Sequence, residues 1–263
     1  LIVRLISTTL VFFLIDSADD VFLYAWIWTF AWFFINLGSF LLLKSNLGVV
    51  LTTFNFNNAL QHIREGFPIY ISVIFISLYT ISRLLLLGIF ESEKILGLYS
   101  IGEKTAALFQ MIPTSILVAA IMPKLMKIYE NDPNTAQQHT RFIQNLTNIY
   151  AVVIFIIAFL LAPQIITLVS GSLYDDSILT FRLLMISVML TLFNSYRISF
   201  LISSGKYNVY AKIHTVFGII GFVAFIPLIK YFSYIGLCTG SMAIELGILA
   251  TTIVYMKRNS IKI

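Results

Sequence analysis

The stretch PIYISVIFISLYTISRLLLLGIF at positions 68–90 contains a single charged residue, Arg83, among 23 residues. About 20 mostly apolar residues are enough for an α-helix to cross the hydrocarbon core of a bilayer. Seven further stretches of this character are separated by polar segments, at positions 3–15, 21–43, 97–126, 142–168, 178–202, 211–229 and 233–256. The sequence therefore predicts an all-α, polytopic membrane helix bundle with eight spans.

The composition agrees with a membrane protein. The 263 residues are 59% hydrophobic and 11% charged, with a mean hydropathy of +0.93, whereas a soluble domain carries roughly a quarter charged residues. One cysteine, Cys238, and three scattered histidines offer neither a disulfide framework nor a metal-binding spacing. Catalytic and phosphate-binding motifs are absent from the sequence, so we expect no catalytic residues, no metal, no cofactor and no enzymatic activity.

The charges predict the orientation of the chain in the membrane. If the C-terminus is cytoplasmic, eleven of the 17 basic residues lie inside, three lie outside and three lie within spans. Eight acidic residues fall on the outside: Asp16, Asp19, Asp20, Glu91, Glu93, Glu103, Asp175 and Asp176. The net charge of +5 thus reflects topology and the anionic inner leaflet, and does not indicate a nucleic-acid partner.

The segment 44–67 is the longest loop between spans and the best candidate for a domain boundary. Its apolar spacing predicts a short amphipathic helix on the membrane surface. We expect residues 1–43 to be the last two helices of an earlier bundle, and residues 68–263 to form a six-helix bundle. Because Leu1 begins inside an apolar run with no basic flank, we expect a fragment whose start lies upstream. A second polar loop is expected at 127–141, where Asp132-Pro133 is a turn signal.

Three arginines within spans are the first candidates for substrate binding. Ionisable side chains at membrane depth usually face a bundle interior or a wet cavity. Arg83 lies roughly 10 Å from the outer end of its span. Arg182 and Arg197 lie nearer the two ends of the span 178–202 that they share. Each of the three side chains could face the bundle interior or snorkel to the interface. Asn194 and Tyr196 form a polar patch between the last two. Guanidinium groups in an apolar bundle suit an anionic, phosphate-bearing substrate.

Three other residues suggest roles in transport. Glu245 lies near the middle of the last span, where it could bind a proton or a cation, or form a structural ion pair. Lys104, next to Glu103, is expected near the interface, where it could guard an outer opening to the substrate. Pro113 interrupts its span and predicts a kink, which could be static or a functional hinge.

Motif order over most of 68–250 resembles the C-terminal half of bacterial polysaccharide flippases, the O-antigen and capsule repeat-unit exporters of the multidrug/oligosaccharidyl-lipid/polysaccharide transporter superfamily. The matching segments are YTISRLLLLGIF (79–90), ILGLYSIGEKTAALFQMIP (95–113), MP (122–123), LAPQIITLVSGSLYDDS (161–177), LISSGKY (201–207) and YIGLCTGSMAIELG (234–247). Their order carries the resemblance, because no single segment is specific. One departure is Ser82, where many relatives have an aspartate.

The resemblance implies twelve helices in two six-helix lobes around a cavity that opens alternately to each face. The implied substrate is an undecaprenyl-diphosphate-linked oligosaccharide, which a proton or cation gradient drives across the bacterial inner membrane. A polysaccharide polymerase and a chain-length regulator are the implied protein partners. Since an aspartate that could bind the coupling ion is missing at Ser82, coupling would depend on Glu245.

Two other classes of function stay open. A multidrug or peptidoglycan-precursor (lipid II) exporter of the same superfamily would share the fold, but an exporter of cationic drugs should carry acids rather than arginines in its cavity. A membrane polysaccharide polymerase or glycosyltransferase would usually show a large outer loop or a carboxylate motif. The outer loops here are short, which argues against an enzyme of that kind.

Overall fold

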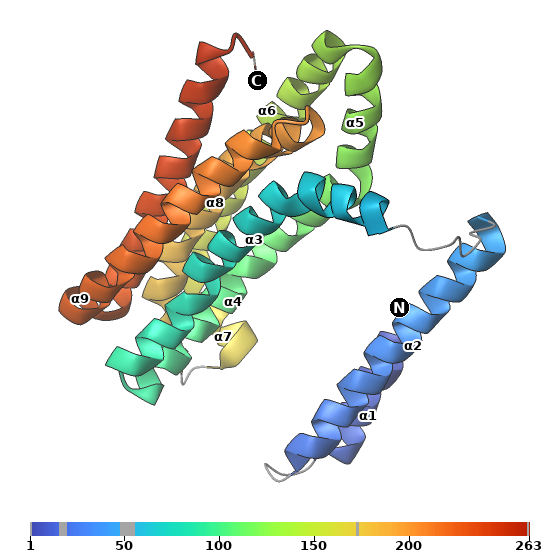
Figure 1. Ribbon diagram of the computed structural model, residues 1–263. Helices are drawn as coiled ribbons and strands as arrows, with labels where there is room; N and C mark the ends of the chain where they lie inside the picture. The colour runs from blue at the N-terminus through green and yellow to red at the C-terminus, as the bar shows by residue number, and fades with distance from the viewer. Residues whose placement is uncertain (1, 16–19, 48–55, 172–173, 262) are drawn as a thin grey trace. The chain divides into compact units, whose positions relative to one another are not determined.

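The computed structural model describes residues 2–15, 20–47, 56–171, 174–261 and 263, and within these ranges it contains helices and no strands. Their order is α1 (Ile2–Leu14), α2 (Val21–Leu47), α3 (Phe56–Phe90), α4 (Glu93–Ile116), the π-helix η2 (Leu117–Ile121), α5 (Met122–Asn131), α6 (Pro133–Leu160), α7 (Ala162–Ser170), α8 (Ser177–Ser203) and α9 (Tyr207–Arg258) (Figure 1). Asp16, Asp19 and part of the expected surface helix (48–55) lie outside the described residues.

Within the described ranges, six helical segments are long and apolar enough to cross a membrane, at Val21–Ser45, Ile69–Phe90, Glu93–Asn131, Pro133–Leu160, Ser177–Ser203 and Tyr207–Arg258. Many bulky apolar side chains on these helices are exposed, among them Leu85, Leu108 and Val223. An apolar outer surface of this extent suits lipid rather than water. The all-helical membrane fold is therefore confirmed, whereas the count of eight spans stays a prediction.

Helix α9 is a hairpin of two antiparallel segments, 207–232 and 234–258. Ser233 has φ 54° and ψ −145°, which are not helical values, and the chain reverses there (Figure 1). Small residues let the two segments pack closely: a Cβ at Gly236 would lie 2.1 Å from the Leu228 carbonyl oxygen, and one at Gly247 would lie 2.2 Å from the Phe217 ring. The loop expected after position 229 is thus a tight reversal.

The polar segment 127–141 is helical, so the expected loop was wrong in all but one residue. Helix α5 continues to Asn131 and α6 begins at Pro133. Asp132 separates them with extended backbone, and its carboxylate accepts hydrogen bonds from the Asn134 and Thr135 amides. An Asp N-cap followed by Pro at the first helical position is a strong helix start, and here it outweighs the polar composition.

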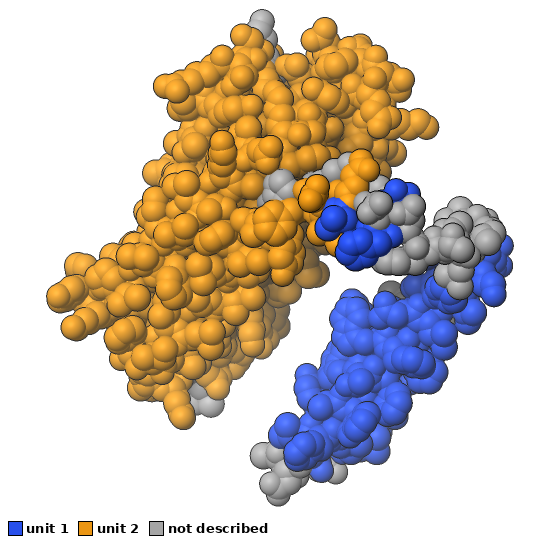
Figure 2. Space-filling view, in the orientation of Figure 1, with its two compact units in different colours: residues 1–60 blue, residues 61–263 orange. Residues whose placement is uncertain are grey.

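The chain divides into two compact units, Leu1–Leu60 and Gln61–Ile263 (Figure 2). In the first unit, α1 packs on α2 and the Arg4 guanidinium lies 5.7 Å from the Trp32 ring centre. In the second unit, α8 is the central helix and packs against α4, α6 and α9. Its fully buried Phe181 and Met185 lie in a core that Leu87 and Phe225 also join. The polar side chains described below lie within this core or beside it.

Candidate functional site

Two polar pairs join α3 to the second segment of α9. Arg83 donates from Nη1 to the Ser241 hydroxyl at 3.1 Å, and the Tyr79 hydroxyl donates to Glu245 Oε1 at 3.2 Å. Each helix contributes residues four positions apart, which places them on one face one turn apart. The two helices are therefore antiparallel here, and we call these four residues the polar ladder.

Glu103 of α4 completes the surroundings of Arg83. Its Oε1 lies 3.0 Å from Arg83 Nη2, and the two side chains are 18% and 16% exposed. Arg83 also donates from Nε to the Thr80 carbonyl at 3.2 Å. The charged group is therefore held by three helices within the bundle and does not snorkel. Lys104, the next residue in α4, is exposed and makes no ion pair among the described residues.

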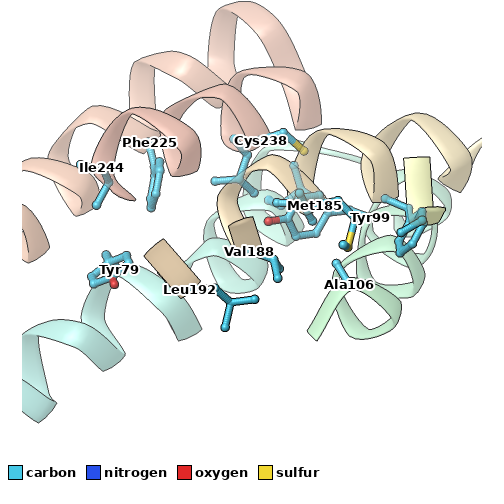
Figure 3. Packing of buried hydrophobic residues seen from close by; sticks show 14 of the residues in the cluster. Tyr79, Tyr99, Ala106, Met185, Val188, Leu192, Phe225, Cys238 and Ile244 are labelled. Carbon is cyan, nitrogen blue, oxygen red and sulfur yellow. The ribbon is translucent and has the colours of Figure 1, made fainter. Parts of the chain in front are cut away.

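Tyr99 lies one helical turn before Glu103 and is fully buried. Its hydroxyl faces the Glu103 carboxylate and is close enough to Arg83 to interact electrostatically, although its contact with Glu103 lies outside normal hydrogen-bond geometry. Figure 3 shows Tyr79 and Tyr99 within the packed interior that also holds Cys238, Val188 and Ile244. The Tyr99 hydroxyl therefore belongs to the surroundings of the Arg83–Glu103 pair.

Arg182 lies apart from the polar ladder. It donates from Nε to the Phe159 carbonyl at 3.1 Å, and its guanidinium lies 5.0 Å from the centre of the Phe159 ring. It also lines a surface pocket of about 660 Å³ together with Lys94, Asp175 and Asp176. The structure thus places Arg182 in a mixed-charge pocket at one end of the bundle.

Arg197 and its neighbours are held by Gln144 of α6, which is fully buried. Gln144 Oε1 accepts from the Tyr196 and Arg197 amides, at 3.1 and 3.3 Å, and Nε2 donates to the Leu192 carbonyl at 3.2 Å. The Arg197 guanidinium donates to the Phe193 carbonyl, and its buried Nε has no partner among the described residues. A side chain from α6 therefore binds the backbone of α8 in mid-helix.

The remaining predicted residues lie near this position. Asn194 is buried and donates to the Thr252 hydroxyl at 3.2 Å. Tyr196 and Pro113 line the same small apolar pocket of about 280 Å³. Pro113 lies inside α4, and the π-helix η2 begins four residues later. Arg83 and Glu245 thus share one site, Pro113 and Tyr196 share another, and Arg182 belongs to neither.

Sequence reasoning missed Glu103, Tyr99 and Gln144 as members of these sites. Glu103 was assigned to the outer acidic residues because it is close to the start of its predicted span. The spacing of four between Tyr99 and Glu103, repeated in Tyr79–Arg83 and Ser241–Glu245, was the available signal. Among the residues that the structure describes, no group of three or more His, Cys, Asp or Glu side chains could hold a metal ion.

Comparisons with known proteins point to one class of membrane protein. Residues 1–129, just under half of the chain, match the family model described as "Polysaccharide biosynthesis protein". The chain is 23% identical over 243 residues to a protein of Shigella dysenteriae named "Putative O-antigen transporter", a match that covers 90% of this chain and 59% of that protein. No solved structure matches. These findings support the resemblance inferred from the sequence: the chain is a multi-pass helical membrane protein that is similar to polysaccharide biosynthesis proteins and to an O-antigen transporter.

Proposed function

We propose that this chain forms part of a transporter that moves lipid-linked oligosaccharide repeat units from the cytoplasmic to the outer leaflet of the bacterial inner membrane, for O-antigen or capsule synthesis. The similarity to an O-antigen transporter supports this class of cargo. Such a substrate combines an isoprenoid tail, a diphosphate and a sugar chain. We expect transport rather than catalysis, with a polysaccharide polymerase and a chain-length regulator as partners.

The observation that carries the proposal is Arg83, a guanidinium held inside the bundle by α3, α4 and α9. A charged side chain at membrane depth is costly and usually serves a substrate or ion path. Arginine binds phosphate oxygens bidentately and stays charged in every environment. We assign Arg83 to the diphosphate of the substrate, and Arg182, Arg197, Lys104, Asn194 and Tyr196 to further substrate contacts along its path.

The architecture that we propose has two six-helix lobes that work by alternating access. Residues 1–43 would supply the last two helices of the first lobe, 44–67 the linker, and 68–263 the second lobe with a cytoplasmic C-terminus. The match covers 59% of the length of the relative. The excess of basic residues on the predicted cytoplasmic side supports the orientation.

Glu245 is the proposed site for the coupling ion, and Pro113 the proposed hinge. The Glu245 carboxylate accepts a hydrogen bond from Tyr79, interacts with the Thr191 side chain and makes no ion pair with a described residue. A carboxylate that no cation neutralises can take up a proton or a small cation. Pro113 precedes a π-helical segment, and a break in the regular ladder of backbone hydrogen bonds is a common place for a helix to bend.

The test is complementation of a flippase-null, polysaccharide-producing bacterium by the full-length transporter, scored as surface polysaccharide at matched protein levels. We expect the parent to rescue, Arg83→Gln to fail, and Arg258→Gln, which changes an exposed basic residue, to rescue like the parent. Removing one partner of a buried pair destabilises a protein by about 3–5 kcal/mol. A double variant in which Arg83 and Glu103 are both glutamine restores neutrality. If that folded, neutral variant also rescued, Arg83 would not be the phosphate ligand.

One observation favours an exporter of cationic drugs as the second candidate. Glu103 and Glu245 bring two carboxylates close to a single guanidinium, Arg83. An exporter of cations needs acids in its cavity. Loss of drug efflux in the deletion strain, with surface polysaccharide unchanged, would support this candidate and contradict the first.

A further inference from the structure

Arg83 is already paired in this structure, so an anionic substrate needs more than an open path to reach it. Glu103 Oε1 lies 3.0 Å from Nη2, and both side chains are largely buried. A phosphate that approached this pair would meet the charge of the carboxylate as well as that of the guanidinium. Either Glu103 leaves Arg83 when the phosphate arrives, or the phosphate has to bind beside a carboxylate that repels it.

Two features of the site suit an exchange of ligands. A guanidinium has five N–H groups, and three of those on Arg83 have partners: Thr80, Ser241 and Glu103. The other two have none among the described residues, so there is capacity for a second oxygen. The fully buried Tyr99 hydroxyl lies beside the pair and faces the Glu103 carboxylate. When that carboxylate leaves, the hydroxyl is a donor that an incoming phosphate oxygen can use.

We propose that Glu103 is an exchangeable counter-ion: a phosphate group of the substrate displaces its carboxylate from Arg83 and takes hydrogen bonds from Arg83 and from the Tyr99 hydroxyl. This inference rests on the proposed function and assigns two further residues to its binding site. Glu103 keeps the buried guanidinium paired while no substrate is bound. Because Glu103 is on α4 and Arg83 is on α3, the exchange breaks the only ion pair between these helices among the described residues.

The alternative is a static ion pair that fastens α3 to α4. The two possibilities predict different effects of neutralising Glu103 on phosphate binding. If Glu103 competes with the ligand, its neutralisation strengthens phosphate binding. If it only holds the helices together, its neutralisation loosens the site and weakens binding or leaves it unchanged.

The experiment measures binding of farnesyl diphosphate to the purified full-length transporter in detergent by calorimetry, with uncharged farnesol as the matched ligand. We expect Glu103→Gln to bind the diphosphate about tenfold or more tightly than the parent, because the competing charge is gone. Tyr99→Phe should bind it about tenfold more weakly, since a hydrogen bond to a charged group is lost. Arg83→Gln should abolish the difference between diphosphate and alcohol. Glu130→Gln changes an exposed carboxylate and should bind like the parent.

Each outcome decides the proposal, with folding of every variant checked by its melting temperature. Tighter binding in Glu103→Gln, lost when Arg83→Gln is added, supports the exchange. Unchanged or weaker binding in a folded Glu103→Gln protein overturns the proposal. Glu103→Asp keeps the charge, so tighter binding by Glu103→Asp than by Glu103→Gln also overturns it. A parent that rescues surface polysaccharide while Glu103→Gln shows no gain leaves the flippase function standing without the exchange. A parent that neither rescues nor binds the diphosphate overturns both.

Discussion

Replacing Gly218 by alanine should separate α3 from the first segment of α9 and weaken the polar ladder. A Cβ at Gly218 would lie 2.6 Å from the Phe75 carbonyl oxygen and 2.9 Å from the Phe75 Cβ. Ordinary contact begins near 3.4 Å, so one helix must retreat by roughly 0.8 Å. The neighbouring atom is backbone, which cannot rotate away as a flexible side chain can. The Tyr79–Glu245 hydrogen bond, at 3.2 Å, lies one turn farther along α3 and would lengthen with that shift.

The expected destabilisation follows from two opposing effects. Overpacking a tight contact costs about 1–3 kcal/mol, while exchanging glycine for alanine within a helix contributes about 0.5–1 kcal/mol of stability. Gly97→Ala is the matched control, because it makes the same exchange in α4 where no described atom of another part of the chain lies within 4 Å of the new Cβ. The helix-forming contribution cancels between the two variants. Their difference is therefore the contact alone, about 1–3 kcal/mol.

The assay is thermal unfolding of the detergent-purified transporter, followed by loss of the monodisperse peak in size-exclusion chromatography. We expect Gly218→Ala to melt roughly 5 °C below Gly97→Ala, from a shift of about 2–4 °C per kcal/mol in a domain of this size. Surface polysaccharide should also fall in Gly218→Ala at matched protein levels. Equal melting temperatures for the two variants would refute the close approach of α3 and α9.

Three further changes test other parts of the bundle. Gln144→Met should lower the free energy of unfolding by at least about 1 kcal/mol, because it removes the hydrogen-bond partners of the α8 backbone; the exposed Gln164→Met is the control in the same melting assay, and equal effects would contradict the argument. The Thr135 hydroxyl and the amides at the start of α6 lower the pKa of Asp132 below its usual value of 3.8. The ionised carboxylate therefore stabilises the first turn of α6 at any pH above the pKa of the unfolded state, and this stabilisation is lost as the pH falls through the lower pKa of the folded state. Protection of the first α6 amides, measured as their exchange rate relative to the intrinsic rate at the same pH, should therefore fall in acid in the parent, and this loss of protection should be absent in Asp132→Asn. Pro113→Ala should raise the melting temperature, since proline in a helix interior costs about 3 kcal/mol, and if Pro113 is a hinge the same variant should transport more slowly; unchanged transport would make it a static kink.

The helices were predictable because apolar runs of this length have few other structures open to them. The interior position of Arg83 was also predictable, because a single charged residue within such an apolar run usually faces the inside of a bundle. Its partner was not, because an acid near the end of a span looks like any interfacial acid. Only the packing of α3 against α4 shows that Glu103 turns inward.

The errors at helix ends have local physical causes. Polar composition predicted a loop over 127–141, yet Asp132 and Pro133 start a new helix after a single extended residue. The reversal at Ser233 agrees with the expected break between the spans 211–229 and 233–256, but its tightness was not predicted, because it depends on the close packing of Gly236 on Leu228. Gln144 looked like an ordinary polar residue because its partners are backbone atoms of a helix 48 or more residues away along the chain.

The hairpin in α9 has a consequence for how the chain is made. As one straight helix its 52 residues would reach roughly 78 Å, far beyond a hydrocarbon core of about 30 Å. Only Ser233 departs from helical geometry between the two segments. No flexible loop therefore separates them that could remain in water while the second segment is synthesised. We therefore expect the two segments to enter the lipid together as a hairpin, so that a charge placed in either one impairs the insertion of both.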